Sequence, residues 1–220
     1  MSVYGLALHT SSPELGLALS NFAGDSRCRT WDLGRSLSTE LHHLLAEFIQ
    51  PQTWADLAFL AVAKGPGSFT GTRIGVVTAR TLAQQLDIPL FAISTLASVV
   101  WAQYLDGADG SESGTMPMEK PFANAVQMPA QRGQVFAAIY QVSPKGSGLT
   151  ELLPDTVMTP EAWQQTLASW SIPYHLIQAP DALGTSVSSL LELAYLDWQQ
   201  GKRPDWSEAL PFYGQHPVDN

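Results

Sequence analysis

The sequence contains one cysteine, few basic residues and no long apolar run. Cys28 is the only thiol among 220 residues, so an internal disulfide is excluded and nothing suggests an oxidising compartment. Only 11 Lys and Arg stand against 20 Asp and Glu, which gives a formal charge of −9. Such an acidic chain cannot hold a nucleic-acid backbone by bulk electrostatics, because that requires a concentrated basic surface. Any contact with RNA is therefore expected to be indirect, through another protein.

No apolar stretch is long enough to span a membrane. The first apolar run follows the uncharged start Met1-Ser2-Val3-Tyr4 and ends by His9, which is also too short for a signal peptide. We therefore expect a cytoplasmic protein without membrane association. Apolar residues make up 45% of the chain and charged residues 14%, which is typical of a globular protein.

The order of the expected elements in the first half predicts an α/β fold. Three apolar runs separated by short polar turns predict an antiparallel meander, and helical and strand patterns then alternate. The expected elements are, in order, strands at 3–8, 15–20 and 27–33, a helix at 39–49, a strand at 57–63, a helix at 70–86, a strand at 90–93 and a helix at 95–105. We expect them to form a first lobe, residues 1–105.

The second half has a weaker pattern. Residues 106–119 contain no Lys or Arg and are rich in Gly, Ser and acidic residues, which predicts a surface loop or interlobe linker. The elements expected beyond it are strands at 123–127, 135–140 and 174–177 and helices at 160–169 and 186–199. We expect residues 106–220 to form a second, smaller lobe whose last helix packs back on the first. No internal repeat is visible.

The segment Lys64-Gly65-Pro66-Gly67-Ser68-Phe69-Thr70-Gly71 is the most informative one. It connects a buried strand to a helix, where backbone N–H groups and the helix dipole can hold an anion. Its spacing matches neither the P-loop nor the dinucleotide fingerprint. Ser68 lacks the strained elbow of a nucleophile, so we expect it to cap the helix.

Small and apolar residues recur every four positions along this helix. They form one row of Gly71, Gly75 and Ala79 and a second row of Ile74, Thr78 and Leu82. The first row leaves a groove in which another backbone can approach closely. The pattern is compatible with packing inside the chain or with a subunit interface, and by itself it favours the former.

Residues 64–75 resemble the signature of the bacterial TsaB family, also called YeaZ. Further segments match that family in order. They are Leu8-His9-Thr10-Ser11-Ser12, Ile88-Pro89, Ser94-Thr95-Leu96, Ala130-Gln131-Arg132-Gly133-Gln134-Val135-Phe136 and Pro211-Phe212-Tyr213. The match covers residues 3–105 well and the remainder more sparsely.

The resemblance implies a two-lobed, actin-like (ASKHA) ribonuclease-H-like fold with a degenerate nucleotide site. It also implies a non-catalytic scaffold that activates TsaD, the subunit that transfers the threonylcarbamoyl group to adenosine 37 of tRNA, and that pairs with the ATPase TsaE. Alone, such a chain is expected to form a homodimer and to bind no cofactor tightly. If ATP or ADP with magnesium binds at the subunit junction of the complex, the residues expected to contact it are Gly65, Gly67 and Ser68. The partner surface implied on the two first-lobe helices comprises Gly71, Ile74, Gly75, Thr78, Ala79, Leu82, Leu41 and Leu45.

The chain departs from the family pattern at positions that matter for catalysis. His9 replaces an early Asp, Pro129 replaces a second Asp, and Tyr213-Gly214-Gln215 replaces a terminal Tyr-Leu-Arg. Actin-like ATPases use acidic residues near such turns to organise magnesium and water. These losses favour a scaffold, and we expect no catalytic residue.

Two enzymatic functions are alternatives to the scaffold. An autonomous ATP-dependent phosphotransferase should carry two phosphate-binding loops and an acid at the first turn of each lobe, which the sequence lacks. A glycoprotease-like metallopeptidase needs zinc ligands at helical spacing, but His42 and His43 are adjacent and the other histidines are isolated. We therefore expect no metal site. Cys28 lies between two arginines in an expected strand, where a lone Cys is usually inert.

Overall fold

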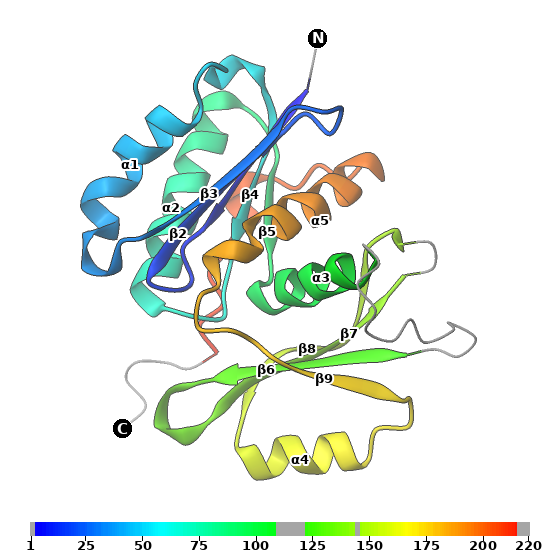
Figure 1. Cartoon of the computed structure of the whole chain (residues 1–220). Coiled ribbons are helices and arrows are strands. Elements are labelled where there is room, and N and C mark those ends of the chain that lie inside the picture. Colours follow the sequence, from blue (N-terminus) through cyan, green and yellow to red (C-terminus); the bar gives the residue numbers. More distant parts are fainter. Residues whose placement is uncertain (1–2, 109–121, 144–145, 215–220) are drawn as a thin grey trace.

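The computed structural model describes residues 3–108, 122–143 and 146–214, which form two β-sheets with helices packed against them (Figure 1). The strands are β1 (Tyr4–His9), β2 (Glu14–Ser20), β3 (Ser26–Asp32), β4 (Leu57–Ala63), β5 (Leu90–Ile93), β6 (Ala123–Pro129), β7 (Val135–Val142), β8 (Leu149–Met158) and β9 (Tyr174–Gln178). The helices are α1 (Leu37–Phe48), α2 (Phe69–Leu86), α3 (Thr95–Ala108), α4 (Pro160–Ala168) and α5 (Val187–Gln199).

The first sheet has the strand order β3-β2-β1-β4-β5. β1, β2 and β3 form the predicted antiparallel meander, and β4 and β5 continue the sheet in parallel with β1. Helices α1 and α2 cover one face, and α5 covers the other (Figure 1). β4 is apolar throughout because alternate residues enter different cores: Leu60 and Val62 face α1 and α2, whereas Ala61 faces α5.

The second sheet has the order β8-β7-β6-β9, which repeats the connectivity of β3-β2-β1-β4. In both sheets an antiparallel meander is followed by a strand parallel to its first member. Helix α4 covers the outer face and α3 lies between the two sheets (Figure 1). The sequence shows no such repeat, because the same strand pairing can be satisfied by different apolar side chains.

Strand β8 was not predicted from the sequence. It carries Glu151, Pro154 and Asp155, which obscure its alternation, and its register with β7 shifts beside Ile139. A proline is tolerated there because β8 is an edge strand and pairs on one side only.

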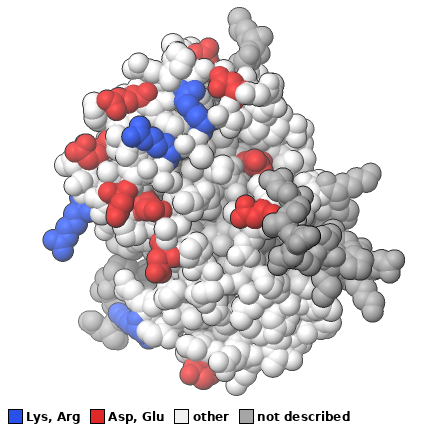
Figure 2. Space-filling view, viewed as in Figure 1, with Lys and Arg blue, Asp and Glu red and all other residues white. Residues whose placement is uncertain are grey.

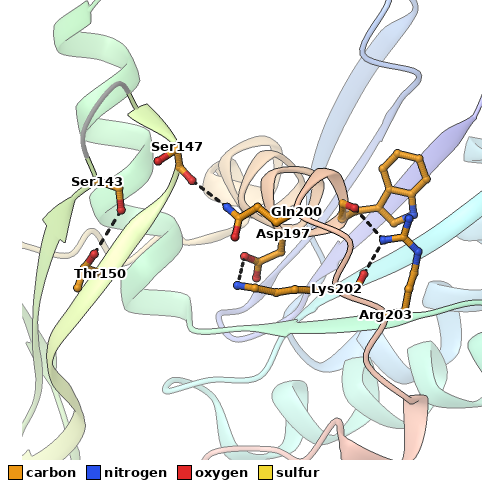
Figure 3. Close-up of polar contacts among 8 residues, drawn as sticks. Ser143, Ser147, Thr150, Asp197, Gln200, Lys202 and Arg203 are labelled. Atoms are coloured by element: carbon orange, nitrogen blue, oxygen red, sulfur yellow. Dashed lines mark hydrogen bonds and ion pairs between the residues drawn. The ribbon is translucent and has the colours of Figure 1, made fainter.

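Helix α5 follows the second sheet in sequence but packs on the first. Val187, Leu190 and Ala194 share a core with Ala7 of β1. The end of this helix also contacts the β7–β8 hairpin, because Gln200 Nε2 donates to the carbonyl of Ser147 at 3.2 Å (Figure 3). The chain therefore crosses between the sheets more than once.

Among the described residues, no helix combines the length and the apolar character needed to cross a bilayer. Most of the expected linker at 106–119 lies outside the described residues; its first residues, 106–108, end α3.

Candidate functional site

A cleft of about 700 Å³ lies where the two lobes meet. β1 and β4 are parallel, so the turns that follow them reach the same edge of the sheet, and the β6–β7 turn faces them from the second lobe. The segments that line the cleft include Ser11, Ser12 and Pro13, Gly67 to Thr70, Met128 to Arg132, and Phe212 with Tyr213. Each of these segments stands out in the sequence, but only the fold brings them together around one cavity.

The glycine loop packs against its own chain. Ser68 caps α2 as predicted, since its Oγ accepts from the Gly71 N–H at 3.2 Å. The Ser68 N–H donates to the Ser11 carbonyl at 2.7 Å. A Cβ on Gly67 would overlap that same carbonyl, and a Cβ on Gly65 would lie 2.7 Å from the Phe212 carbonyl. These glycines therefore make room for neighbouring backbone, and part of the expected anion cradle is already occupied by internal hydrogen bonds.

The C-terminal segment is bound to this loop. The Phe212 N–H donates to the Lys64 carbonyl at 2.6 Å, and the Tyr213 ring lies 4.9 Å from that of Phe69. The Arg73 guanidinium lies over both rings, 5.1 Å and 5.9 Å from their centroids. The Pro211-Phe212-Tyr213 motif thus holds one wall of the cleft in place.

The small residues of α2 approach Thr10, which directly follows β1 of the same chain. A Cβ on Gly71 would overlap the Thr10 carbonyl, and a Cβ on Gly75 would overlap Thr10 Oγ1. Thr10 Oγ1 also donates to the Gly71 carbonyl at 2.8 Å. The close approach that the spacing indicated is therefore made inside the molecule.

Most residues that we expected at a partner interface are buried in the first lobe. The buried ones are Gly71, Gly75, Thr78, Ala79, Leu41 and Leu45, and Ile74 and Leu82 are partly buried against the same core. These side chains face the protein's own interior. A partner that docks on α1 and α2 would contact other residues of these helices, such as Val77, whose side chain is 60% exposed.

His9 stands where an acid was expected, at the end of β1, and is 0% exposed. Its Nδ1 accepts from the Ser11 N–H at 3.4 Å, which places the proton of the neutral ring on Nε2. Nε2 has no hydrogen-bond partner within the described part of the chain. Burial lowers the pKa of His9 to about 3, so the ring is neutral at physiological pH. It supplies neither a charge nor a carboxylate oxygen for a cation.

The second-lobe turn also lacks its acid. Pro129 ends β6, and the turn continues through Arg132, whose φ of 58° places it in the left-handed region. Among the described residues that line the cleft, Asp181 is the single carboxylate, and it lies on the loop after β9 rather than at a strand end of β1 or β6. Magnesium bound to a nucleotide is held by the phosphates and by one or two carboxylates that face them. His9 and Pro129 supply no such carboxylate, so the described residues of the cleft do not fit a magnesium–nucleotide complex.

Asp155 makes a partly buried polar contact between the lobes that the sequence did not indicate. Its Oδ1 accepts from Ser94 Oγ and from Tyr140 OH, both at 2.9 Å. Ser94 Oγ in turn caps α3 by accepting from the Leu96 N–H at 3.1 Å. Burial raises the pKa of Asp155. Because Asp155 lies in the unpredicted strand β8, no motif could have identified it.

No group of three or more His, Cys, Asp or Glu side chains that could hold a metal ion occurs among the described residues. His43 and Glu47 form an exposed i,i+4 pair at 3.2 Å on α1, far too few ligands for a zinc site.

These features define the class of protein. It is a two-lobed α/β protein with an actin-like, ribonuclease-H-like fold. The cleft lies between the lobes, but the strands β1 and β6 that lead to it end in His9 and Pro129 rather than in acidic residues.

The comparisons with known proteins identify the family. The model of the family described as "TsaD: tRNA N6-adenosine threonylcarbamoyltransferase" matches residues 35–169. The chain belongs to this family and, as the sequence motifs indicated, to its TsaB (YeaZ) branch.

Two curated relatives and two solved structures are similar to the chain. The "tRNA threonylcarbamoyladenosine biosynthesis protein TsaB" of Bacillus subtilis is 34% identical over 140 residues, 59% of this chain and 54% of the relative. The protein of the same name from Escherichia coli is 30% identical over 118 residues, 52% of this chain and 46% of the relative. The chain thus spans about half the length of these relatives. Two solved structures from Pseudomonas aeruginosa share the fold, each with a TM-score of 0.74. The one titled "YeaZ" is 21% identical and covers 96% of this chain, and the one described as similar to peptidase YeaZ is 20% identical and covers 98%. Both align over 100% of their own length.

Proposed function

We propose that this chain is a non-catalytic scaffold that activates a TsaD-like catalytic subunit in the threonylcarbamoyl modification of tRNA, together with a TsaE-like ATPase. The relatives from Bacillus subtilis and Escherichia coli are named as biosynthesis proteins of this tRNA modification. The observation that carries the scaffold role is His9, a neutral and fully buried ring at the position where an actin-like ATPase needs an acid. We expect the protein to act in the cytoplasm.

An autonomous ATP-dependent phosphotransferase is the alternative function. It is disfavoured because β1 and β6, the two strands that should end in acidic residues, end in His9 and Pro129. In addition, the Ser68 N–H of the glycine loop already donates a hydrogen bond to the Ser11 carbonyl and is not free to bind a phosphate. We therefore propose that the isolated chain binds no nucleotide tightly. ATP or ADP with magnesium would be bound only in the complex, where a partner can contribute the missing carboxylates.

The exposed side of α2, beside α1, is the partner surface that we propose. Val77 lies at its centre, and its neighbours one turn away, Arg73 and Thr81, are also exposed. An exposed valine gains about 25 cal/mol for each Å² that a partner covers. Without the partner, we expect the same surface to support weak self-association.

We propose that tRNA is held by the partner. On the face shown in Figure 2, the basic side chains are interspersed with acidic ones, and the net charge is −9. Tight phosphate binding needs several cations acting together.

Reconstitution tests the proposed function. The chain is mixed with TsaD-like and TsaE-like proteins, tRNA, ATP and the threonylcarbamoyl donor, and modified adenosine is measured by mass spectrometry. We expect no ATP hydrolysis by the chain alone and a strong increase in modification when it is added to the partners. Ser68→Ala serves as the matched variant for the glycine loop. Magnesium-dependent ATP turnover by the chain alone that disappears in Ser68→Ala would favour the phosphotransferase.

A further inference from the structure

The segment that follows the last 3-10 turn of the chain contacts both lobes. Residues 209–214, which we call the C-terminal strap, lie beside the cleft in the segment drawn in red in Figure 1. Ala209 is 1% exposed and belongs to the core of the first lobe. The Phe212 ring packs against the core under the second sheet, and a Cβ on Gly214 would overlap the Val157 side chain of β8. The strap therefore joins the two lobes by non-covalent contacts.

Few hydrogen bonds hold the strap. Within the described part of the chain, one backbone hydrogen bond ties residues 210–214 to the rest, from the Phe212 N–H to the Lys64 carbonyl at 2.6 Å. Lys64 directly follows β4, so the backbone of Phe212 is bound to the first lobe while its ring packs on the second. Leu210 adds little packing, because its side chain is 62% exposed. A segment held in this way can detach locally while the sheets stay folded.

The other connections between the lobes lie away from the cleft. The chain crosses from β5 through α3 to β6, and again from β9 to α5. α3 and α5 pack on each other, and neither helix contributes a residue to the described lining of the cleft. Ser94 and Asp155, which are hydrogen-bonded at the start of α3, also lie outside that lining. A rotation about the α3–α5 contact would therefore change the separation of the two walls that the strap connects.

We propose that the C-terminal strap fixes the angle between the two lobes, and that its detachment allows the cleft to open. If the walls move apart, Phe212 must either leave the core of the second lobe or give up its hydrogen bond to Lys64. Both contacts are lost together when the strap detaches, so the attached and detached states form a two-state element. Phe212 and Tyr213 line the cleft, so detachment also removes part of its wall.

Arg73 connects the strap to the exposed side of α2. Its guanidinium lies 5.9 Å from the centroid of the Tyr213 ring, and its side chain is exposed one turn before Val77. A partner that docks there and binds Arg73 would weaken the cation–π contact that helps to hold Tyr213. Docking would then favour the detached strap and the open cleft. This regulatory step rests on the proposed partner surface, whereas the role of the strap in setting the lobe angle does not.

Distances between two spin labels test the strap in the chain alone. In a Cys28→Ser background, Glu40→Cys on α1 and Gln164→Cys on α4 place labels at exposed positions on helices of different lobes. Phe212→Ala removes the ring from the second core, and Leu210→Ala is the matched control, an apolar truncation in the same segment at an exposed position. We expect a longer-distance population in Phe212→Ala and the unaltered distribution in Leu210→Ala.

Two results would overturn the role of the strap in this measurement. One is an unaltered distance distribution in Phe212→Ala when its circular dichroism is native. The other is an equal lengthening in Leu210→Ala, because an exposed side chain cannot hold the second lobe. If Phe212→Ala does not fold, Phe212→Leu replaces it, since leucine keeps an apolar side chain and loses only part of the ring's packing. The same shift, at a smaller population, is then expected.

Hydrogen exchange shows whether the strap detaches without global unfolding. In the unaltered chain, the Phe212 amide should exchange at least about tenfold faster than the buried Leu60 amide of β4, and its rate should change little in low urea. Equal rates for the two amides would mean that the strap opens only when the whole protein unfolds, and the proposal would fail.

The same measurement tests Arg73 without any partner. Arg73→Gln removes the cation over Tyr213 and should speed exchange of the Phe212 amide about two- to fivefold. Arg80→Gln is the control, because Arg80 lies over Trp206, outside the strap, at 5.7 Å from its ring centroid. An unchanged rate in Arg73→Gln would contradict the coupling to the α2 surface. Because neither variant requires a partner, that outcome is distinct from a failure of the proposed function.

Discussion

Acidification should destabilise this protein through His9. Burial lowers the pKa of His9 from 6.5 to about 3 in the folded state. Below pH 6.5 the unfolded chain takes up a proton that the folded chain excludes, so stability is complete above that pH and is lost as the pH falls toward 3. At pH 5 the difference amounts to about 2 kcal/mol, since each pKa unit corresponds to about 1.4 kcal/mol.

Urea titrations at pH 7.5 and pH 5.0, followed by circular dichroism, measure this effect. His9→Asn removes the titrating ring, so the variant should lose about 2 kcal/mol less than the unaltered protein between the two pH values. The raised pKa of Asp155 acts in the opposite direction, but it is common to both proteins and cancels in the comparison. His42→Gln, at an exposed position on α1, is the control and should behave like the unaltered protein. An identical pH dependence for His9→Asn and the unaltered protein would refute the argument.

Three further predictions follow from the packing and the charge. Gly75→Leu should lower the melting temperature by roughly 2–12 °C, because overpacking against Thr10 costs about 1–3 kcal/mol; Gln84→Leu, exposed on the same helix, is the control and should change it little. Val77→Asp should weaken binding to the TsaD-like partner in calorimetry while the melting temperature stays nearly constant, and unchanged affinity would place the partner elsewhere. Filter binding at about 0.15 M salt should show no submicromolar complex of the chain with tRNA, and a tight complex would contradict the partner-held model.

The elements that were predicted correctly are those specified by local chemistry. The meander, the strand β4 and the helix α2 follow from apolar periodicity, and Ser68 caps α2 because its hydroxyl satisfies a free N–H of the first turn. The family signature lies in these same elements, so the resemblance was visible in the sequence. β8 was missed because pairing with β7 overrides a sequence that contains Pro154 and acidic residues.

The sequence by itself determined the elements of the first lobe, the lack of acids at two turns, and the family. Only the tertiary structure decided which of these residues are buried inside the chain and which are exposed for contact with another molecule. The spacing of Gly71 and Gly75 requires a close neighbour, but a helix pattern cannot say whether that neighbour is Thr10 of the same chain or a second protein. His9 could be recognised as the replacement for an acid, yet its neutral state follows from complete burial, which depends on residues distant in sequence. The cleft and the C-terminal strap likewise arise from segments brought together by folding, because Phe212 and Lys64 are far apart in the sequence.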